Sequence, residues 1–132
     1  GLQMQILPGK NPGIITGRQE THQYQEKFLA VCQYLNQNLS SNITLEMAAS
    51  YAGFSKFHFS RLFKEFVGMS FSQYVTGQRL HKAKLLLLTT QASITDIAME
   101  AGFSSSTFNR VFYQSEKMSP TDFRQNHAKL KN

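Results

Sequence analysis

The sequence predicts an all-α fold of about seven helices, in which two helix-turn-helix units are joined by a long central helix. Three observations lead to this prediction: one segment occurs twice at a fixed spacing, apolar residues recur every three or four positions, and glycines stand where paired helices would turn. With 132 residues, 41% of them hydrophobic, the chain is long enough for one small packed domain or two very small ones.

The repeat aligns residues 44–74 with residues 93–123, an offset of 49. Ten of the 31 aligned positions are identical, whereas chance would give roughly two at ordinary residue frequencies. The identical pairs include Gly53 with Gly102, Ser55 with Ser104, and Arg61 with Arg110. Such a duplication indicates two copies of one supersecondary unit.

Each copy is expected to form a short helix, a tight turn and a second helix. Thr44 and Ser93 are N-cap residues, and small apolar residues follow them at helical spacing. Gly53 and Gly102 would end the first helix, because the left-handed backbone at a helix C-cap costs glycine little. A serine two residues after each glycine then caps the second helix. The expected bounds of the two units are 44–67 and 93–115.

The second helix of each unit has an apolar face and a polar face. In the first unit the apolar residues are Phe59, Leu62, Phe63 and Phe66. The opposite face carries Phe57, Ser60, Arg61 and Lys64 in the first unit and Ser106, Asn109, Arg110 and Tyr113 in the second. A polar, arginine-bearing face is what a helix needs in order to read base edges in the major groove of DNA.

The joining helix is expected over residues 70–88. At 1.5 Å per residue it would be roughly 28 Å long, close to one turn of B-DNA at about 34 Å. Its length would therefore suit two reading helices in successive major grooves. A further helix is expected over residues 22–39, and a last short one begins near Pro120. Residues 1–21 are interpreted as a linker remnant and residues 128–132 as a frayed tail.

Positive charge is concentrated in one third of the chain. The net charge is +6, from 14 Lys and Arg against eight Asp and Glu, and residues 53–84 hold six basic residues with one acidic residue. Such a stretch attracts phosphates or another anionic surface. It is equally typical of a solvated helix face, and charge alone does not separate the two.

Composition excludes several classes of protein. A single cysteine, Cys32, rules out a disulfide framework and any multi-cysteine metal site, and we expect it in the core. The four histidines lack metal-ligand spacing, and no catalytic constellation is present, so we expect neither an enzyme nor a metal or cofactor. The longest apolar run, Leu85–Leu88, is far shorter than the about 20 residues of a membrane span, and no signal peptide begins the chain. We therefore expect a cytoplasmic protein without a membrane partner.

The segments GFSKFHFSRLFKEFVGMSFSQYV (53–75) and QRLHKAKLLLLTTQASITDIAMEAGFSSSTFNRVFYQSEKMSPTDFR (78–124) resemble the DNA-binding domain of the AraC/XylS transcriptional regulators. The resemblance covers about residues 22–127, as one domain, with the family's motifs in order. It implies that the chain binds double-stranded DNA sequence-specifically, with one helix of each unit in the major groove, in a bacterial regulator. Many members of this family are activators.

The resemblance also implies which residues contact DNA. The base-reading positions fall on Lys56, Phe57, His58, Ser60 and Arg61 in the first unit, and on Ser105, Ser106, Thr107, Asn109 and Arg110 in the second. We expect Lys64, Arg79, Lys82 and Tyr113 at phosphates. Plainer alternatives stay open: the arginines and lysines as solvated surface residues, Phe57 packed on a neighbouring helix, His58 at its helix start, and Tyr113 covering its own helix.

Two features depart from the family pattern. The turn after Gly102 is one residue shorter than in many members, and Lys117 stands where glycine is usual. Full-length members often carry an effector-binding or dimerising domain, which would be missing here. Some activators touch RNA polymerase near the position of Asp96, although a capping role with Ser93 explains Asp96 without polymerase.

Two rival hypotheses remain. The chain could be a basic protein-interaction module that docks an acidic partner, or only its first unit could read bases while the second holds the backbone.

Overall fold

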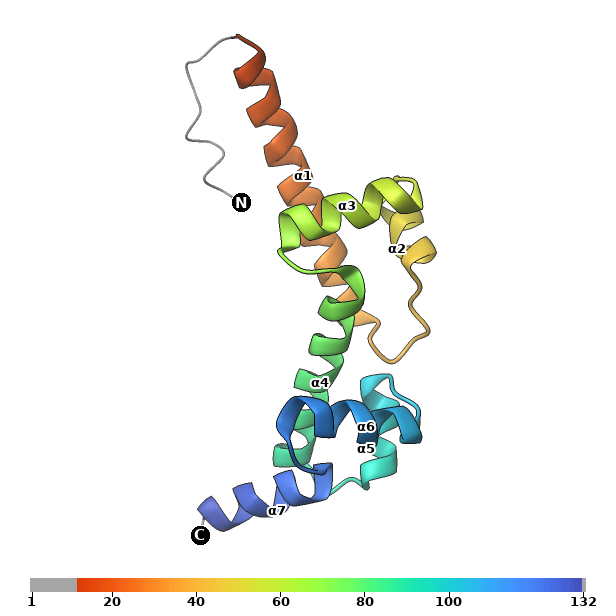
Figure 1. The fold of residues 1–132 in the computed structure, drawn as a ribbon, viewed down its shortest axis with the longest axis vertical. Coiled ribbons are helices and arrows are strands. Elements are labelled where there is room, and N and C mark those ends of the chain that lie inside the picture. Colours follow the sequence, from red (N-terminus) through yellow and green to blue (C-terminus); the bar gives the residue numbers. More distant parts are fainter. Residues whose placement is uncertain (1–11, 132) are drawn as a thin grey trace. The chain divides into compact units, whose positions relative to one another are not determined.

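A computed structural model of the protein describes residues 12–131, and every regular element in that range is an α-helix (Figure 1). The seven helices are α1 (Pro12–Gln37), α2 (Leu45–Ala52), α3 (Lys56–Val67), α4 (Phe71–Thr89), α5 (Ile94–Ala101), α6 (Ser105–Glu116) and α7 (Pro120–Lys131). The predicted all-α fold, with two helix pairs and a long helix between them in sequence, is confirmed. None of the helices within residues 12–131 has the length and apolar character needed to cross a membrane.

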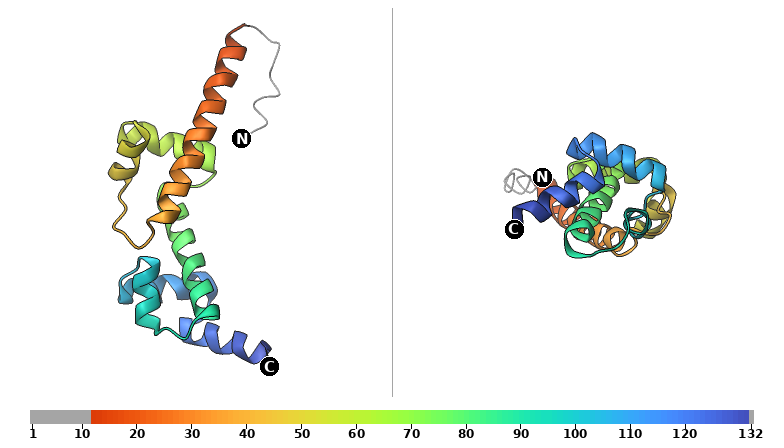
Figure 2. Two further views of the ribbon diagram at one scale, coloured as in Figure 1. Left: turned by 180° about the vertical axis from the view of Figure 1, so that it is seen from behind. Right: turned by 90° about the horizontal axis from the view of Figure 1, so that it is seen from below.

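The described residues form two compact units, each with its own helix-turn-helix. The first unit contains α1, α2, α3 and the start of α4, up to Tyr74. The second unit contains the rest of α4 with α5, α6 and α7, and also the short segment Asn38–Asn42. Within the first unit α2 and α3 pack on α1, and within the second α5 and α6 lie beside α4 (Figure 2).

The core of the first unit is built from phenylalanine. The ring of Phe28 on α1 contacts four other rings at centroid distances of 5.5–6.0 Å, those of Phe54, Phe59, Phe63 and Phe66. Phe59 and Phe63 have no exposed surface. Because full burial of such side chains contributes about 1.5–3 kcal/mol each, α3 is held by one face and its opposite face is left to solvent.

The second unit repeats this arrangement. Phe108 and Phe112 on α6 have no exposed surface, and they pack with Phe123 of α7 and Leu87 of α4 in one apolar cluster. The rings of Phe112 and Phe123 meet edge to face at 5.4 Å. The face of α6 opposite these rings is therefore exposed as well.

The two helix-turn-helix turns have the same length and the same caps. Ser55 and Ser104 are extended N-caps with nearly equal dihedral angles (φ −65°, ψ 158° and φ −75°, ψ 157°), and each hydroxyl accepts a backbone N–H three residues on. Gly53 and Gly102 are left-handed C-caps, at φ 82° and φ 101°. The short second turn noted in the sequence thus starts α6 in the way that the first turn starts α3.

Two boundaries differ from the sequence-based expectation. Helix α1 begins at Pro12, so residues 12–21 are helical where a linker remnant was predicted. Proline suits the first helical position, and the glycines that suggested a linker cost only about 1 kcal/mol each in a helix. Helix α7 continues to Lys131, through most of the predicted frayed tail, because Phe123 anchors it in the core. Residues 1–11 and 132 lie outside the described residues.

Lys117 ends α6 in a strained backbone conformation. Its φ of 62° is left-handed, and it is the one non-glycine residue with positive φ within residues 12–131. The equivalent position in the first copy is Gly68, at φ 94°. The Lys117 ammonium donates a hydrogen bond to the carbonyl oxygen of Gln114 at 3.0 Å, which partly offsets the strain.

We expect Lys117→Gly to raise the free energy of unfolding by roughly 0.5–1 kcal/mol, because strain relief of about 1–2 kcal/mol exceeds the added entropy of the unfolded chain. Chemical denaturation of the two proteins measures the difference. The reciprocal change, Gly68→Lys, should destabilise. A Lys117→Gly protein less stable than the wild type would contradict this account.

Candidate nucleic-acid interface

Helices α3 and α6 each expose one stripe of four residues at helical spacing. The first outward stripe consists of Phe57, Ser60, Arg61 and Lys64, and the second of Ser106, Asn109, Arg110 and Tyr113. The two stripes are equivalent under the offset of 49, and all eight residues are exposed. The faces predicted from helical spacing are therefore the faces that solvent reaches.

Arg61 and Arg110 occupy the same place in their stripes. Among the described side chains, those of residues 21–128, neither guanidinium takes part in an ion pair or a side-chain hydrogen bond. Glu65, one turn after Arg61, does not pair with it. Both forks of donors are therefore unengaged and free to meet a bidentate acceptor such as a guanine edge or a phosphate.

Two aromatic residues stand on these polar faces. Phe57 is 81% exposed and Tyr113 is 59% exposed. The alternative in which Phe57 packs on a neighbouring helix is wrong, because so exposed a ring is not covered by any helix of the unit. The ammonium of Lys56 lies over the Phe57 ring, 5.3 Å from its centroid. Single exposed apolar residues are common on protein surfaces, so the exposure of Phe57 leaves its ring accessible to a partner but does not by itself indicate one.

The remaining predicted base-reading residues lie beside the stripes. His58 and Thr107 are half-buried at equivalent positions, and the His58 ring meets Phe54 edge to face at 5.0 Å. Ser105 is exposed at the first position of α6, and its carbonyl oxygen accepts a hydrogen bond from the Asn109 amide at 3.2 Å. These residues flank the exposed faces. His58 and Thr107 are less exposed to solvent than Ser105 and the residues of the stripes.

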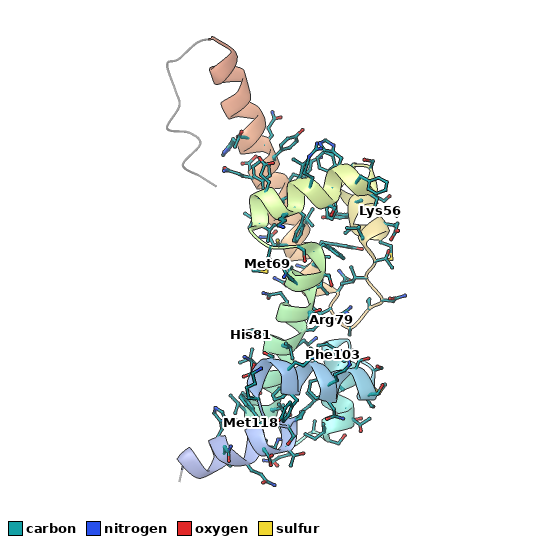
Figure 3. The ribbon with its side chains drawn as sticks, in the orientation of Figure 1. Lys56, Met69, Arg79, His81, Phe103 and Met118 are labelled. Atoms are coloured by element: carbon teal, nitrogen blue, oxygen red, sulfur yellow. The ribbon has the colours of Figure 1, made fainter. Side chains whose placement is uncertain are left out.

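Lys56 begins α3 in an exposed ion pair (Figure 3). Its ammonium lies 3.3 Å from the carboxylate of Glu46 on α2. The pKa of Glu46 is lowered, first by a hydrogen bond to its own backbone and then by Lys56. Because an exposed ion pair of this kind contributes little to stability, Lys56 can exchange the carboxylate for a phosphate at little cost.

Arg79 corrects a sequence-based prediction. It was expected at a phosphate, but its Nε donates to the carbonyl oxygen of Leu39 at 3.0 Å and its Nη2 to that of Ser41 at 2.9 Å. Partial burial lowers the pKa of its guanidinium. A signal for this was present in the sequence: Val75, Arg79 and Ala83 follow one another at four-residue spacing, and both neighbours are buried. Arg79 thus lies on the inner face of α4 (Figure 3).

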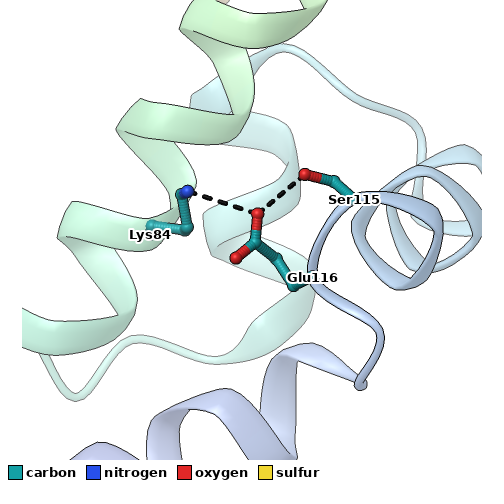
Figure 4. Close-up of polar contacts among 3 residues, drawn as sticks. All are labelled: Lys84, Ser115 and Glu116. Atoms are coloured by element: carbon teal, nitrogen blue, oxygen red, sulfur yellow. Dashed lines mark hydrogen bonds and ion pairs between the residues drawn. The ribbon is translucent and has the colours of Figure 1, made fainter.

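The two lysines of α4, Lys82 and Lys84, lie near acidic groups. The Lys84 ammonium is 3.2 Å from the Glu116 carboxylate, which also accepts a 2.7 Å hydrogen bond from the Ser115 hydroxyl (Figure 4). Lys82 lies at 4.0 Å from the carboxylate of Glu100, at the limit of an ion pair. Lys82 therefore remains more available to a phosphate than Lys84.

Glu116 titrates in a stabilising environment. Its pKa is lowered, first by the Ser115 hydrogen bond and then by Lys84, against the opposing effect of burial. A group with a depressed folded pKa stabilises the protein above its unfolded pKa, here about 4.3, and this contribution is lost as the pH falls through the folded value.

We expect Glu116→Gln to lower the free energy of unfolding by about 1 kcal/mol at pH 7. The difference from the wild type should shrink below about pH 4.3 and vanish in stronger acid. Urea denaturation at a series of pH values measures it. Glu100→Gln is the matched control, because the Glu100 side chain is 65% exposed and its carboxylate is as far as 4.0 Å from the Lys82 ammonium. A deficit that does not change with pH would contradict the assignment.

Other candidate chemistry is sparse in the described part of the chain. Among the side chains that the structure describes, those of residues 21–128, no group of three or more His, Cys, Asp or Glu is placed to hold a metal ion. Cys32, expected in the core, is half-buried, and burial raises the pKa of its thiol. The outward stripes of α3 and α6 therefore stand as the candidate site.

Comparison with known proteins gives one family and a set of similar chains. Residues 48–126 match the helix-turn-helix domain family. Regulatory protein PocR of Salmonella typhimurium is 36% identical over 103 residues, which are 77% of this chain and 34% of PocR. The chain thus spans about a third of the length of that relative.

Two solved structures of regulator domains are similar over most of the chain. The C-terminal domain of AraT, a response regulator from Geobacillus stearothermophilus, superposes with a TM-score of 0.73 at 30% identity, covering 76% of this chain and 84% of that one. The DNA-binding domain of AdpA, a global transcriptional factor in complex with a target DNA, gives a TM-score of 0.73 at 26% identity, covering 75% and 90%.

Proposed function

Because the chain belongs to the AraC-type helix-turn-helix family, we propose that it reads a specific double-stranded DNA site with the outward stripes of α3 and α6, each in a major groove. The chain is a DNA-binding domain of a transcription regulator, and this family is not an enzyme family. The observation that carries the proposal is the repeated stripe, with an unengaged arginine at the same place in both copies.

The stripes supply different kinds of contact. Arg61 and Arg110 read guanine, because a guanidinium donates to O6 and N7 together. Asn109 suits adenine, and the exposed ring of Phe57 suits a thymine methyl group. Lys64 and Tyr113, at the far ends of their stripes, meet phosphates, which set the position of the helix without reading sequence.

The role of the whole protein is proposed on the family resemblance. We infer an activator in the bacterial cytoplasm, with RNA polymerase as a second partner and an effector-binding or dimerising domain elsewhere in the full-length protein. In α5 the backbone N–H of Asp96 donates to the Ser93 hydroxyl at 3.0 Å, while the Asp96 carboxylate is exposed. The cap therefore engages the backbone N–H of Asp96 and leaves its carboxylate available to a partner.

Selection from random DNA duplexes tests the proposal. The expected result is a site of two short boxes about 10 bp apart, bound at least 10³-fold more tightly than scrambled DNA at physiological salt. A single box would mean that only one unit reads bases. Salt-sensitive binding without an enriched sequence would overturn the proposal and favour a basic module with an acidic protein partner.

We expect Arg61→Ala and Arg110→Ala each to cost about 1–3 kcal/mol on the selected site and to relax the base preference in one box. On scrambled DNA both changes should have a small effect. Fluorescence anisotropy titrations with the two duplexes measure these losses.

Lys64→Ala, on the same stripe as Arg61, is the matched control. It should weaken binding to both duplexes alike and reduce the slope of log K against log salt by about one. If both arginine variants lost the same affinity on selected and scrambled DNA, the base-reading assignment would be wrong.

A further inference from the structure

One residue of the second outward stripe is held in place by its own helix. Asn109 is the fifth residue of α6, and its side chain is exposed. Its amide nitrogen donates a hydrogen bond to the backbone carbonyl oxygen of Ser105, four residues earlier, at 3.2 Å. A carbonyl oxygen can only accept, so this contact fixes which end of the amide is nitrogen and which is oxygen. The Asn109 side chain therefore lies against the first turn of α6 in a defined orientation.

The contact with Ser105 leaves one donor and one acceptor of the amide unused. A carboxamide carries two N–H groups and one carbonyl oxygen. The N–H on the Cβ side of the amide is the one directed back at the helix backbone, so the other N–H and Oδ1 form the free edge. Among the side chains of residues 21–128, none is hydrogen-bonded to this edge. The free edge of Asn109 therefore offers a donor beside an acceptor.

This donor and acceptor match the major-groove edge of adenine. Adenine presents the N6 amino group as a donor and N7 as an acceptor, and an asparagine amide contacts both in a bidentate pair. Guanine presents two acceptors, O6 and N7, and cytosine presents a donor alone. Because Ser105 already orients the amide, Asn109 has less rotamer freedom left to lose on binding. Asn109 is thus preorganised to select adenine against the other bases.

The first outward stripe carries a different group at the same place. Under the offset of 49, Ser60 of α3 is equivalent to Asn109 of α6, and both side chains are exposed. The Ser60 hydroxyl both donates and accepts, so it contacts either kind of base edge and makes no bidentate choice. A strict requirement for adenine should therefore appear in the box of the second unit, where the amide is, and not at the equivalent place in the box of the first.

We propose that N6-methylation of an adenine in the box of the second unit weakens specific binding, because Asn109 reads that adenine through N6 and N7. The inference rests on the proposed function and names a regulation of its site. One hydrogen of the adenine N6 group pairs with thymine, and the other faces the major groove. A methyl group on N6 replaces the hydrogen that faces the groove. Oδ1 of Asn109 then loses its donor and meets a methyl group instead.

The first step of the test locates the adenine. Selection from random duplexes is repeated with Asn109→Ser, which gives α6 the side chain that α3 carries at the equivalent position. The wild type should enrich an adenine in the box whose base preference Arg110→Ala relaxes, and Asn109→Ser should not enrich it. Because Asn109 is exposed, the variant should melt close to the wild-type temperature. A wild-type box without adenine, or one enriched equally by both proteins, would overturn the inference.

The second step modifies that adenine alone. Fluorescence anisotropy compares the selected duplex with one that carries N6-methyladenine at the position and one that carries 7-deazaadenine, which lacks the N7 acceptor. The wild type should lose about fivefold or more in affinity on the methylated duplex and a smaller factor on the deaza duplex. Asn109→Ser should bind the three duplexes within about twofold of one another, because its contact does not depend on N6 and N7 together. N6-methyladenine outside both boxes is the control for the DNA and should leave wild-type affinity unchanged.

A second variant should change the base preference instead of abolishing it. Asn109→Asp replaces the amide nitrogen with an oxygen in a side chain of the same shape, so the group only accepts. A carboxylate accepts from the N4 amino group of cytosine, whereas the N7 acceptor of adenine repels it. We expect the enriched base at this position to change from adenine to cytosine. A variant that still requires adenine would contradict the direct contact.

Failure of this inference is distinguishable from failure of the proposed function. If the wild type binds the methylated and unmodified duplexes equally while Arg110→Ala still relaxes the box, the inference is wrong and the proposed function stands. If Asn109→Ser keeps the full wild-type response to methylation, another residue reads the adenine and the inference is again wrong. A wild type that enriches no box at all would overturn the proposed function and this inference together.

Discussion

Burial of two phenylalanines under the second helix of each unit is the constraint on which the rest of the structure depends. Phe59 and Phe63 hold α3 by one face, and Phe108 and Phe112 hold α6 in the same register. Truncation of such a buried ring typically costs about 3–5 kcal/mol, so rotation of either helix about its axis is strongly opposed. Because side chains repeat every 3.6 residues, burial of one face also decides which residues face outward. The candidate recognition surface is thus a consequence of the core.

The two copies of the unit have diverged where they meet different surroundings. Their caps and turns are the same, but Gly102 is closely approached by Leu39 and Arg79, whereas Gly53 has open space around it. At the end of the second helix, the two copies differ in backbone strain. Gly68 adopts the left-handed conformation easily in the first copy, and Lys117 adopts it under strain in the second. The outward stripes have diverged less in position than in chemistry, with Lys64 in one and Tyr113 at the equivalent place in the other.

The basic residues divide into those that face solvent without a partner and those that are engaged with other groups of the protein. In the stretch that carries most of the excess charge, Arg61 and Lys64 face solvent, while Arg79 and Lys84 are engaged with carbonyl oxygens or a carboxylate. The charge available to phosphates is therefore smaller than the sum over residues 53–84 suggests. Base contacts from the stripes then become a larger share of the expected interaction with DNA.

The sequence by itself determined the helices, their caps and the exposed stripes, including Arg61 and Arg110, because these depend on local rules: helical periodicity, hydroxyl caps and glycine at left-handed positions. Only the tertiary structure decided what Arg79 and Lys84 do. Their partners, Leu39 and Glu116, lie 40 and 32 residues away in the chain, and helical periodicity specifies no contact at such a distance. The sequence also did not predict that α1 begins at Pro12. The glycines near its start favour a turn locally, and they become helical because the helix continues into a packed core.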